Sequence, residues 1–455
     1  MKRYPEYVHL ITNQEVKDIK YDEVSRLSTL TIQDKSSMST ISIKTDYLIG
    51  ADGSSSMVRK WMSTPFTGHS GHLKWLVVDA VLGPKHPPLP HYMQFVNDPS
   101  RPKLSLPIPH NRYRWEFVLF PDEDEKDMVS LDKVTSLITK CGADMEHLDI
   151  VRKSIYGVQN RIAHQWYNNE NTMLIGDAAH CVPPFLGLGI SSGMRDSMNL
   201  AWKINLCLKG VAPPRHLLNT YMEERKPDVV QISERSTNAG HIIMTHNRVV
   251  ALIRDIILFF LLLIPFVKAL AMSSGMKPST NFASGFKHPR KSKTWRSHLG
   301  SLMYGDFNGH LIAQPRVVHG ERVKLLDEIL GLGFSVLLFN FNRKDGTVCD
   351  SAAVMLDQLK VDDMLWKKLS TSFVQVVKPN IHALHWTRLH PSCNIVEDID
   401  DHLDQYSRGS TPMVIVVRPD KYIYGVFHGD EIEQAFQSLS DAITSGSSTT
   451  SLLVN

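Results

Sequence analysis

Several features are scarce or absent in this sequence, and each absence excludes a class of protein. The five cysteines stand far apart without a CxxC pair, which excludes a disulfide framework and the usual zinc-ligand spacing. Lysine and arginine total 50 against 47 acidic residues, and the formal net charge of +3 is too small to indicate a nucleic-acid partner. The longest apolar run, residues 256–267, is too short to span a membrane, because a spanning helix needs about 20 residues.

The N-terminal residues and the apolar run bear on where the protein is found. No apolar segment follows the basic Lys2 and Arg3, so no secretory signal is indicated, and we predict a cytoplasmic chain with reduced thiols. Charged residues flank residues 256–267 closely, and we interpret this run as a buried or interfacial helix. Membrane contact is therefore not expected. A membrane-anchored interaction protein is an alternative that rests on this run alone.

Length and composition are those of a globular protein with more than one domain. At about 100 to 200 residues per domain, 455 residues suggest two to four domains. Apolar residues make up 42% and charged residues 21%, which excludes a disordered or collagen-like chain. The fold class must come from the order of strand and helix patterns along the chain, which predicts an α/β fold.

The first part of the chain predicts a hairpin, a strand, a glycine-rich turn and a helix. Residues 25–33 and 39–43 alternate roughly between polar and apolar side chains, with a polar turn between them. A strand over residues 45–49 then leads into the turn that contains Asp52 and Gly53, and a short helix follows over residues 57–62. From about residue 75 to 165, short apolar runs and aromatic residues predict a sheet domain, interrupted by a helix over residues 131–141.

A second strand, turn and helix follow in the middle of the chain. The apolar strand over residues 172–175 meets Gly176 and Asp177, after which Pro183, Pro184, Gly187 and Gly189 lead into a helical pattern. One face of that helix carries Ile190, Met194, Met198, Ala201 and Trp202. Further helices are expected to about residue 271, and residues 273–301 are interpreted as a linker or domain margin. Strands over residues 334–339, 373–377, 413–418 and 422–427 predict a small α/β domain at the end.

Both turns carry residues that could bind phosphate or polyol groups, because a strand-to-helix turn presents backbone amides and a helix dipole. In the first, Gly53 permits close approach, Asp52 can accept hydrogen bonds from ligand hydroxyls, and Arg59 can offset phosphate charge. A purely structural turn is an equal alternative there. In the second, which is more specific, Asp177 could accept from a sugar or ribityl hydroxyl, while the amides after Gly187 could face an electron-rich ring edge.

Together these motifs resemble the class A FAD-dependent aromatic monooxygenases, the para-hydroxybenzoate hydroxylase-like family. The later two FAD fingerprints of that family are similar to residues 46–59 and 174–203. The likeness is greatest to the 3-(3-hydroxyphenyl)propionate and phenol hydroxylase branch, through residues 114–117, 183–187 and 195–203. It covers roughly residues 1–270. Residues 416–420 and 424–425 also resemble the thioredoxin-like C-terminal domain common in that family, here without a redox CxxC pair.

The resemblance implies FAD-dependent hydroxylation of a phenolic or other aromatic substrate, in which NAD(P)H reduces the flavin and molecular oxygen supplies one atom. It assigns Asp177, with Gly176, to the ribityl chain and Pro184 to the side of the reactive ring. Gly187, Leu188 and Gly189 would face the pyrimidine end of that ring. Asp52, Gly53 and Arg59 would serve FAD and pyridine nucleotide binding, and Arg161 is a further candidate beside the nicotinamide.

The resemblance also predicts how the chain divides. We expect an incomplete, Rossmann-like FAD-binding domain in residues 1–65 and 166–290, with its helices in the second part. A β-sheet substrate domain is inserted between them over residues 66–165, and a thioredoxin-like C-terminal domain follows over residues 300–455. The catalytic residues are not identified by any motif.

Two departures from the family leave a second hypothesis open. No GxGxxG occurs in the sequence, so the unit that holds the FAD pyrophosphate is missing, and the chain is expected to begin after it. Leu188 stands where the family usually has glutamine between the glycines. The alternative is therefore a non-catalytic pseudoenzyme or truncated fragment that does not hold FAD.

Other residues that attract attention are better explained by structure. His180 lies in a packed turn beside two alanines and is interpreted as structural. The acidic residues between positions 122 and 127 are interpreted as a solvated turn, not a metal loop. Trp75, Trp115 and Trp166 could line a substrate cavity, but core packing is the favoured interpretation. No metal site is expected.

Overall fold

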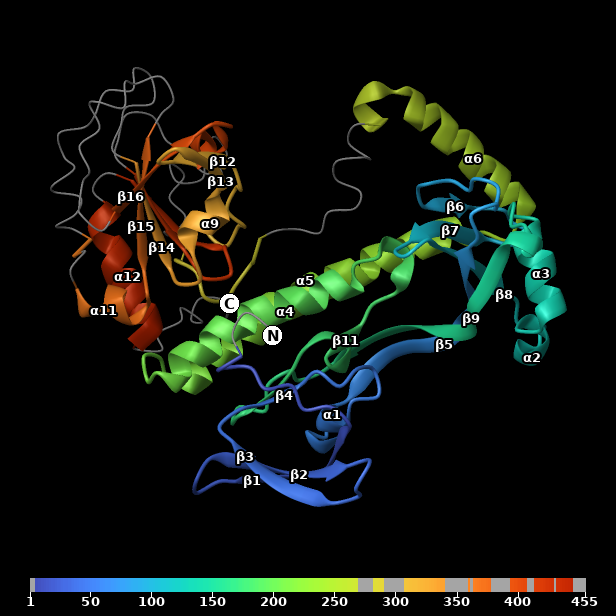
Figure 1. Cartoon of the computed structure of the whole chain (residues 1–455). Helices are drawn as coiled ribbons and strands as arrows, with labels where there is room; N and C mark the ends of the chain where they lie inside the picture. Colours follow the sequence, from blue (N-terminus) through green and yellow to red (C-terminus); the bar gives the residue numbers. More distant parts are fainter. Residues whose placement is uncertain are drawn as a thin grey trace, which may run out of the picture. The chain divides into compact units, whose positions relative to one another are not determined.

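Strands dominate the first third of the chain and a separate mixed sheet dominates the last third (Figure 1). The structure is a computed structural model that describes residues 5–268, 281–289, 307–339, 359–360, 363–377, 393–406, 413–428 and 431–444. Contacts divide the chain into two units. The first unit comprises Met1–Gly193 and Val229–Pro278, and the second comprises Met194–Asp228 and Ser279–Asn455. Most of the linker expected over residues 273–301 lies outside the described residues.

The first unit begins with a three-stranded antiparallel sheet, β1 (Gln14–Asp22), β2 (Leu27–Asp34) and β3 (Thr40–Thr45). The β2–β3 hairpin closes at Asp34, whose carboxylate accepts hydrogen bonds from the amides of Ser36 at 2.8 Å and Ser37 at 2.9 Å. Both amides lie in the turn, where no neighbouring strand accepts their hydrogen bonds, so the carboxylate serves as the acceptor. The hairpin predicted over residues 25–43 is confirmed.

A short parallel pair lies at the centre of the first unit. Strand β4 (Leu48–Gly50) pairs with β10 (Thr172–Leu174), although more than a hundred residues separate them. Helix α1 (Met57–Trp61) follows β4. A Cβ added at Gly50 would come within 2.8 Å of side-chain atoms of Val58 and Leu174, so only glycine lets α1 pack this closely on the pair.

A six-stranded sheet forms the rest of the first unit, in the order β11-β9-β5-β8-β7-β6. Its strands are β5 (Phe66–Leu82), β6 (Gln94–Val96), β7 (Lys103–Ile108), β8 (Arg112–Leu119), β9 (Leu148–Ala163) and β11 (His180–Cys181). Helices α2 (Glu125–Met128) and α3 (Leu131–Thr139) cover one face, where Trp115 and Ile138 are fully buried. The predicted sheet with its interrupting helix is confirmed.

Three helices follow the second turn: α4 (Gly189–Leu208), α5 (Pro214–Ile243) and α6 (Arg248–Leu263). The apolar side of α4 that the sequence suggested is largely exposed, with Ile190 83% and Met194 63% exposed, whereas Trp202 is buried at 6%. Polar residues take the buried side of α4, because they pair with other buried charges.

Helix α6 carries the long apolar run, and its side chains are exposed from Ile256 to Ile264. The interpretation of this run as a buried helix is therefore wrong, and an interfacial position stays a prediction. Ala251 is the buried residue of this helix, and Arg254 donates to the backbone oxygens of Ile242 and Asn97. Among the described residues, no helix is long and apolar enough to cross a membrane.

The second unit contains a seven-stranded mixed sheet in the order β13-β12-β16-β15-β14-β17-β18. Its strands are β12 (Arg316–His319), β13 (Arg322–Leu325), β14 (Ser335–Phe339), β15 (Ser372–Val377), β16 (Cys393–Asp398), β17 (Met413–Val417) and β18 (Ile423–His428). Strands β14, β15 and β16 are parallel, and β17 and β18 are antiparallel. The thioredoxin-like α/β architecture expected here is confirmed.

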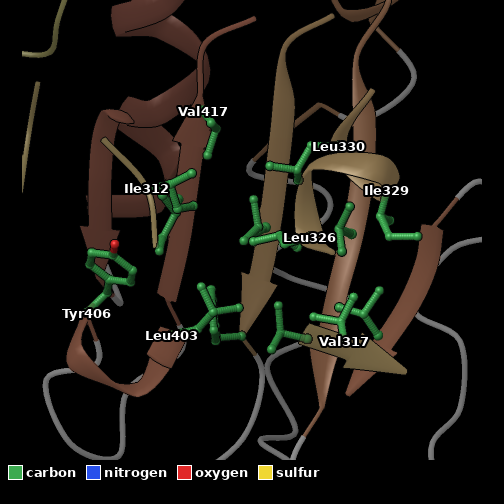
Figure 2. Packing of buried hydrophobic residues seen from close by; sticks show 14 of the residues in the cluster. Ile312, Val317, Leu326, Ile329, Leu330, Leu403, Tyr406 and Val417 are labelled. Carbon is green, nitrogen blue, oxygen red and sulfur yellow. The ribbon is translucent and has the colours of Figure 1, made fainter. Parts of the chain in front are cut away.

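Helices and a buried cluster complete that domain. The helices are α9 (Leu326–Leu330), α11 (Met364–Lys368) and α12 (Ile432–Thr444). Figure 2 shows residues of α9 packing with Val317, Leu403, Tyr406 and Val417 into one hydrophobic core. Continuous burial of β14, β15 and β17 explains why their sequences are runs of apolar residues rather than alternating patterns.

A fully buried ionic cluster lies inside the second unit and was not predicted. Glu224 of α5 pairs with Arg418 at 2.7 Å and with Lys203 of α4 at 2.9 Å, and Arg418 also pairs with Asp420 at 2.6 Å. Asn199 donates to Glu224 at 2.6 Å. Buried charges are tolerated only when they are paired in this way, so the cluster ties α4 and α5 to the end of β17.

Candidate functional site

The two turns recognised in the sequence lie side by side. The parallel pairing of β4 with β10 places Leu174 opposite Gly50, and the amide of Ile175 donates to the carbonyl oxygen of Gly50 at 3.0 Å. The carboxyl ends of the two strands therefore open at one edge, where ligands of α/β folds characteristically bind. Tertiary structure thus joins two motifs that are far apart in sequence into one candidate site.

In the first turn, Asp52 acts as a cap for α1. Its carboxylate accepts from the hydroxyl of Ser56 at 2.5 Å and from the amides of Met57 at 2.7 Å and Val58 at 3.1 Å. Gly53 has a φ of 78°, in the left-handed region that favours glycine, and an added Cβ would meet nothing within 4 Å. The turn is preformed by these bonds, and its glycine backbone is open to a ligand.

Arg59 joins the first turn to the second. Its guanidinium donates to the carbonyl oxygen of Ala178 at 2.8 Å and to that of Ser54 at 2.6 Å, and it lies 3.8 Å from the centre of the Phe66 ring. The side chain is buried, and desolvation lowers its pKa. These contacts give Arg59 a positioning role between the turns, while its expected contact with a nucleotide stays a prediction.

The second turn leaves its acidic side chain exposed. Gly176 has a φ of 57°, and a Cβ added at Gly193 of α4 would lie 3.2 Å from the Cα of Gly176. This close approach explains why glycine occurs at both positions. Asp177 follows with an exposed side chain, so its carboxylate can accept hydrogen bonds from ligand hydroxyls at the edge where the two strands end.

A short loop connects this turn to α4. Pro184 begins a single 3-10 turn that ends at Gly187, whose φ is 64° and whose amide donates to the Pro184 oxygen at 2.9 Å. Helix α4 starts at Gly189, and its first amides have no carbonyl partner within the helix. The amide of Ser192 donates to the carbonyl oxygen of Leu188 at 3.0 Å, so Leu188 is the N-cap residue directly before the helix.

Phe185 fixes this loop against the large sheet. No role for Phe185 was expected from the sequence. Phe185 is buried against Trp75 of β5, with ring centroids 6.3 Å apart. A Cβ added at Gly240 of α5 would lie 2.4 Å from a Phe185 ring carbon, so α5 also confines this ring. The hydroxyl of Ser236 donates to the Pro183 oxygen at 2.6 Å. The sequence marks this position only as an apolar residue between Pro184 and Gly187.

These residues fit a large planar cofactor with a polyol chain. Added Cβ atoms at Gly187 and Gly189 would meet nothing within 4 Å, so the loop backbone is open to contact. The N-terminus of α4 directs backbone amides and the positive end of the helix dipole toward solvent, where they could face an electron-rich group. Asp177 supplies an exposed carboxylate beside them. An open glycine backbone, a helix N-terminus and a carboxylate at one edge are the groups that would hold ribityl and ring atoms of a flavin.

The polar residues at the end of the second fingerprint have other partners. Asp196 accepts from Arg225 at 2.9 Å, and Asn199 and Lys203 bond to Glu224. All are fully buried within the second unit. Their contacts are structural, and they explain the polar face of α4.

The structure also shows the surroundings of His180, of the tryptophans and of Arg161. His180 is buried and its ring centroid lies 5.0 Å from that of Trp166, which fits a structural residue. Trp75 and Trp115 are buried in clusters on opposite faces of the large sheet, so core packing is confirmed for them. Across the described ranges, no group of three or more potential metal ligands is found. Arg161 lies 5.8 Å from the Phe66 ring centre, near Arg59.

Comparison with known proteins identifies the family. Residues 6–236 match the FAD binding domain family, and residues 309–442 match the HcaD C-terminal domain family. The first match covers half of the chain and includes both turns. The chain belongs to the class A FAD-dependent aromatic monooxygenases. FAD is the cofactor of this family and NAD(P)H is its usual reductant.

Curated relatives of this family member are aromatic hydroxylases. A 3-(3-hydroxy-phenyl)propionate/3-hydroxycinnamic acid hydroxylase of Burkholderia vietnamiensis is 32% identical over 429 residues, covering 93% of this chain and 72% of that protein. The corresponding Escherichia coli O157:H7 enzyme is 28% identical, covering 88% of this chain and 68% of its own length. These relatives favour a hydroxylase over the non-catalytic alternative.

Solved structures show the same fold. The flavin-dependent monooxygenase PieE, in complex with FAD and substrate, matches with a TM-score of 0.70 at 18% identity, covering 94% of this chain and 75% of PieE. Aklavinone-11 hydroxylase with FAD and aklavinone matches with a TM-score of 0.68 at 16% identity, covering 94% and 74% of the two chains. The predicted fold class, an FAD-binding domain with an inserted sheet domain and a thioredoxin-like C-terminal domain, is therefore confirmed.

Proposed function

We propose that this chain hydroxylates a phenolic or other small aromatic substrate, with FAD as cofactor, NAD(P)H as reductant and molecular oxygen as the source of the added atom. The relatives named above act, by their names, on 3-(3-hydroxyphenyl)propionate and 3-hydroxycinnamic acid. These two compounds are the first members of the panel to test. The location proposed is cytoplasmic, which the free thiols of Cys141, Cys181, Cys207 and Cys393 support.

One observation carries the proposal: the two fingerprint turns meet at the carboxyl ends of β4 and β10. Gly53 and Asp177 lie at that edge, and Arg59 bonds to carbonyl oxygens of both turns. The arrangement supports a binding role for both turns.

The residues of this chain would divide the work as follows. Asp177 would accept hydrogen bonds from ribityl hydroxyls, and the amides at the start of α4 would stabilise negative charge at the edge of the ring system. Arg59 would hold the turns at a fixed separation, and Phe185 would fix the loop against the sheet. When bound, FAD supplies the redox chemistry that passes electrons from NAD(P)H to oxygen.

The test is oxygen incorporation. The full chain is incubated with FAD, NADPH or NADH, and each phenol of the panel under ¹⁸O₂, and products are analysed by mass spectrometry. The proposal predicts an aromatic product that carries one ¹⁸O atom and consumption of reduced nicotinamide that depends on substrate. The variant Asp177→Asn should lower the rate, whereas Asp122→Asn, at an exposed turn of the sheet domain, should not. Flavin-loaded protein without labelled product for any substrate would favour the non-catalytic alternative.

A further inference from the structure

Helix α6 is apolar on all sides over its second half. Residues 256–263 are all isoleucine, leucine or phenylalanine. Successive residues point about 100° apart around a helix, so any four in a row cover its whole circumference. Over this stretch the exposed fraction of the residues ranges from 38% at Leu258 to 63% at Phe259 and Phe260. The described residues therefore bury no side of it.

The first half of α6 fixes the helix to the first unit. The side chain of Asn247 caps the first turn, where it accepts hydrogen bonds from two backbone amides at 2.9 and 3.2 Å. Ala251 is buried. Arg254 donates to the backbone oxygen of Ile242 at 2.9 Å and to that of Asn97 at 3.0 Å. These contacts tie the base of α6 to α5 and to the sheet domain, and the apolar half continues from that base.

The exposure on all sides favours a lipid environment over a protein partner. A helix that is apolar all round is normally buried, either in the core of a protein or in a membrane. A second copy of the chain, or another protein, packs against one face of a helix and leaves the opposite face in water. Bilayer hydrocarbon surrounds a helix completely. Residues 256–263 are exposed around the whole circumference, so hydrocarbon is the environment that suits them.

The dimensions and the ends of this stretch suit one leaflet of a bilayer. A helix with its side chains is about 10 to 12 Å across, and the hydrocarbon of one leaflet is about 15 Å thick. Arg254 and Asp255 precede the stretch and Lys268 follows it. Charged groups stay at the level of the lipid headgroups, so both ends are expected at the same membrane surface. The exposed side chains of Arg248 and Lys268 can also meet lipid phosphates.

We propose that α6 inserts its apolar half into one leaflet of a membrane, so that the chain binds a lipid surface without crossing it. The inference goes beyond the proposed function and does not depend on it. The expectation of no membrane contact assumed a buried or merely interfacial helix, and the exposed side chains of residues 256–263 remove that assumption. A cytoplasmic location is compatible with binding to the membrane face that borders the cytoplasm.

The test is flotation of the full chain with lipid vesicles in a density gradient without detergent. The vesicles consist of phosphatidylcholine with a minority of phosphatidylglycerol. The native chain should rise with the vesicles. The double variant Phe259→Glu with Phe260→Glu should bind about a hundredfold more weakly, because each phenylalanine taken out of water contributes about tenfold. Added salt should weaken binding of the native chain by less than about threefold, because the contact is mainly apolar.

A matched control carries the same change of charge elsewhere on the first unit. Val24, between β1 and β2, is 94% exposed, and Ile41 of β3 is 49% exposed. Replacing both with glutamate adds two negative charges, as the α6 variant does, so that repulsion by anionic lipid is matched. The control should float with the vesicles as the native chain does. An equal loss of binding in both double variants would refute the inference.

Two further results would overturn the inference. A folded native chain that stays at the bottom of the gradient would show that α6 does not enter lipid. A native chain that ignores vesicles but sediments as a dimer, which Phe259→Glu converts to a monomer, would show that a second copy covers α6.

A second variant keeps the inference testable if the double variant does not fold. Phe260→Trp retains an aromatic ring at an exposed position of α6. The fluorescence that this tryptophan adds to that of the native chain should be quenched by vesicles of phosphatidylcholine with brominated acyl chains. Added fluorescence that these vesicles leave unchanged would refute the insertion of α6.

Discussion

Replacing Glu224 with glutamine is the sharpest test of the packing described for the second unit. Glu224 accepts from Arg418 at 2.7 and 2.8 Å, from Lys203 at 2.9 Å and from Asn199 at 2.6 Å, and it is fully buried. Glutamine preserves the volume but removes the charge. Among the described residues, Asp420 would then be the remaining countercharge for two buried cations.

The loss of unfolding free energy in Glu224→Gln follows from the ion pairs of this carboxylate. Removing one partner of a buried ion pair typically costs about 3 to 5 kcal/mol, because the remaining charge is left uncompensated. Independently, desolvation alone would raise the pKa of Glu224, but the charges of Arg418 and Lys203 outweigh it and lower this pKa from 4.5 to about 2. That difference corresponds to about 3 kcal/mol of stability at neutral pH. The direction of the pKa change fits this cost, and we expect a loss of about 3 kcal/mol.

The same pKa predicts how the loss depends on pH. A carboxyl group with a lowered folded-state pKa stabilises the fold above its unfolded pKa, and this contribution disappears as the pH falls through the folded value. The native chain should therefore lose about 3 kcal/mol between roughly pH 4.5 and 2 through Glu224 alone. Glu224→Gln should not show this component, so the difference between the two proteins should shrink toward pH 2.

Urea unfolding, followed by tryptophan fluorescence and circular dichroism, measures both effects. Trp202 reports on this region, because the Arg418 guanidinium lies 5.3 Å from its ring centre. Glu223→Gln, at the exposed neighbouring position, is the control and should change stability by less than about 0.5 kcal/mol. A loss below about 1 kcal/mol for Glu224→Gln at pH 7, or a pH dependence equal to that of the native chain, would refute the reasoning.

Three further predictions concern the candidate flavin site. Gly240→Ala should displace Phe185, since the new Cβ would lie 2.4 Å from its ring. The variant should then lose FAD during gel filtration, whereas the native chain should retain it. Asp177→Asn should weaken FAD binding about tenfold, as expected for a lost charge-assisted hydrogen bond, and an unchanged affinity by fluorescence titration would contradict this role. In Arg59→Lys, the single ammonium group cannot donate to both carbonyl oxygens as the guanidinium does. The free energy of unfolding in urea should fall by about 2 kcal/mol, and a change near zero would mean that Arg59 does not join the turns.

Local signals in the sequence were sufficient for much of the fold. The hairpin that closes at Asp34, the helix that Asp52 caps and the strand before Gly176 all depend on neighbouring residues, and each was predicted. Strands β14, β15, β17 and β18 were found because they are largely uninterrupted apolar runs. The residues of the two turns could likewise be named from glycine and aspartate alone.

Non-local pairing could not be predicted. Strands β12, β13 and β16 were missed because they are only partly buried and mix polar with apolar residues, so that no clean pattern marks them. The buried cluster joins Glu224 to Arg418 across 194 residues, and no local pattern connects them.

Measuring bound flavin is the most direct test that the two turns form the cofactor site. The chain is purified, incubated with FAD and freed of unbound ligand, and the flavin absorbance per chain is read for the native protein and for Asp177→Asn. We expect near-stoichiometric flavin in the native chain and a clear reduction in the variant. A folded native chain that retains no flavin would contradict the assignment of the two turns as the cofactor site.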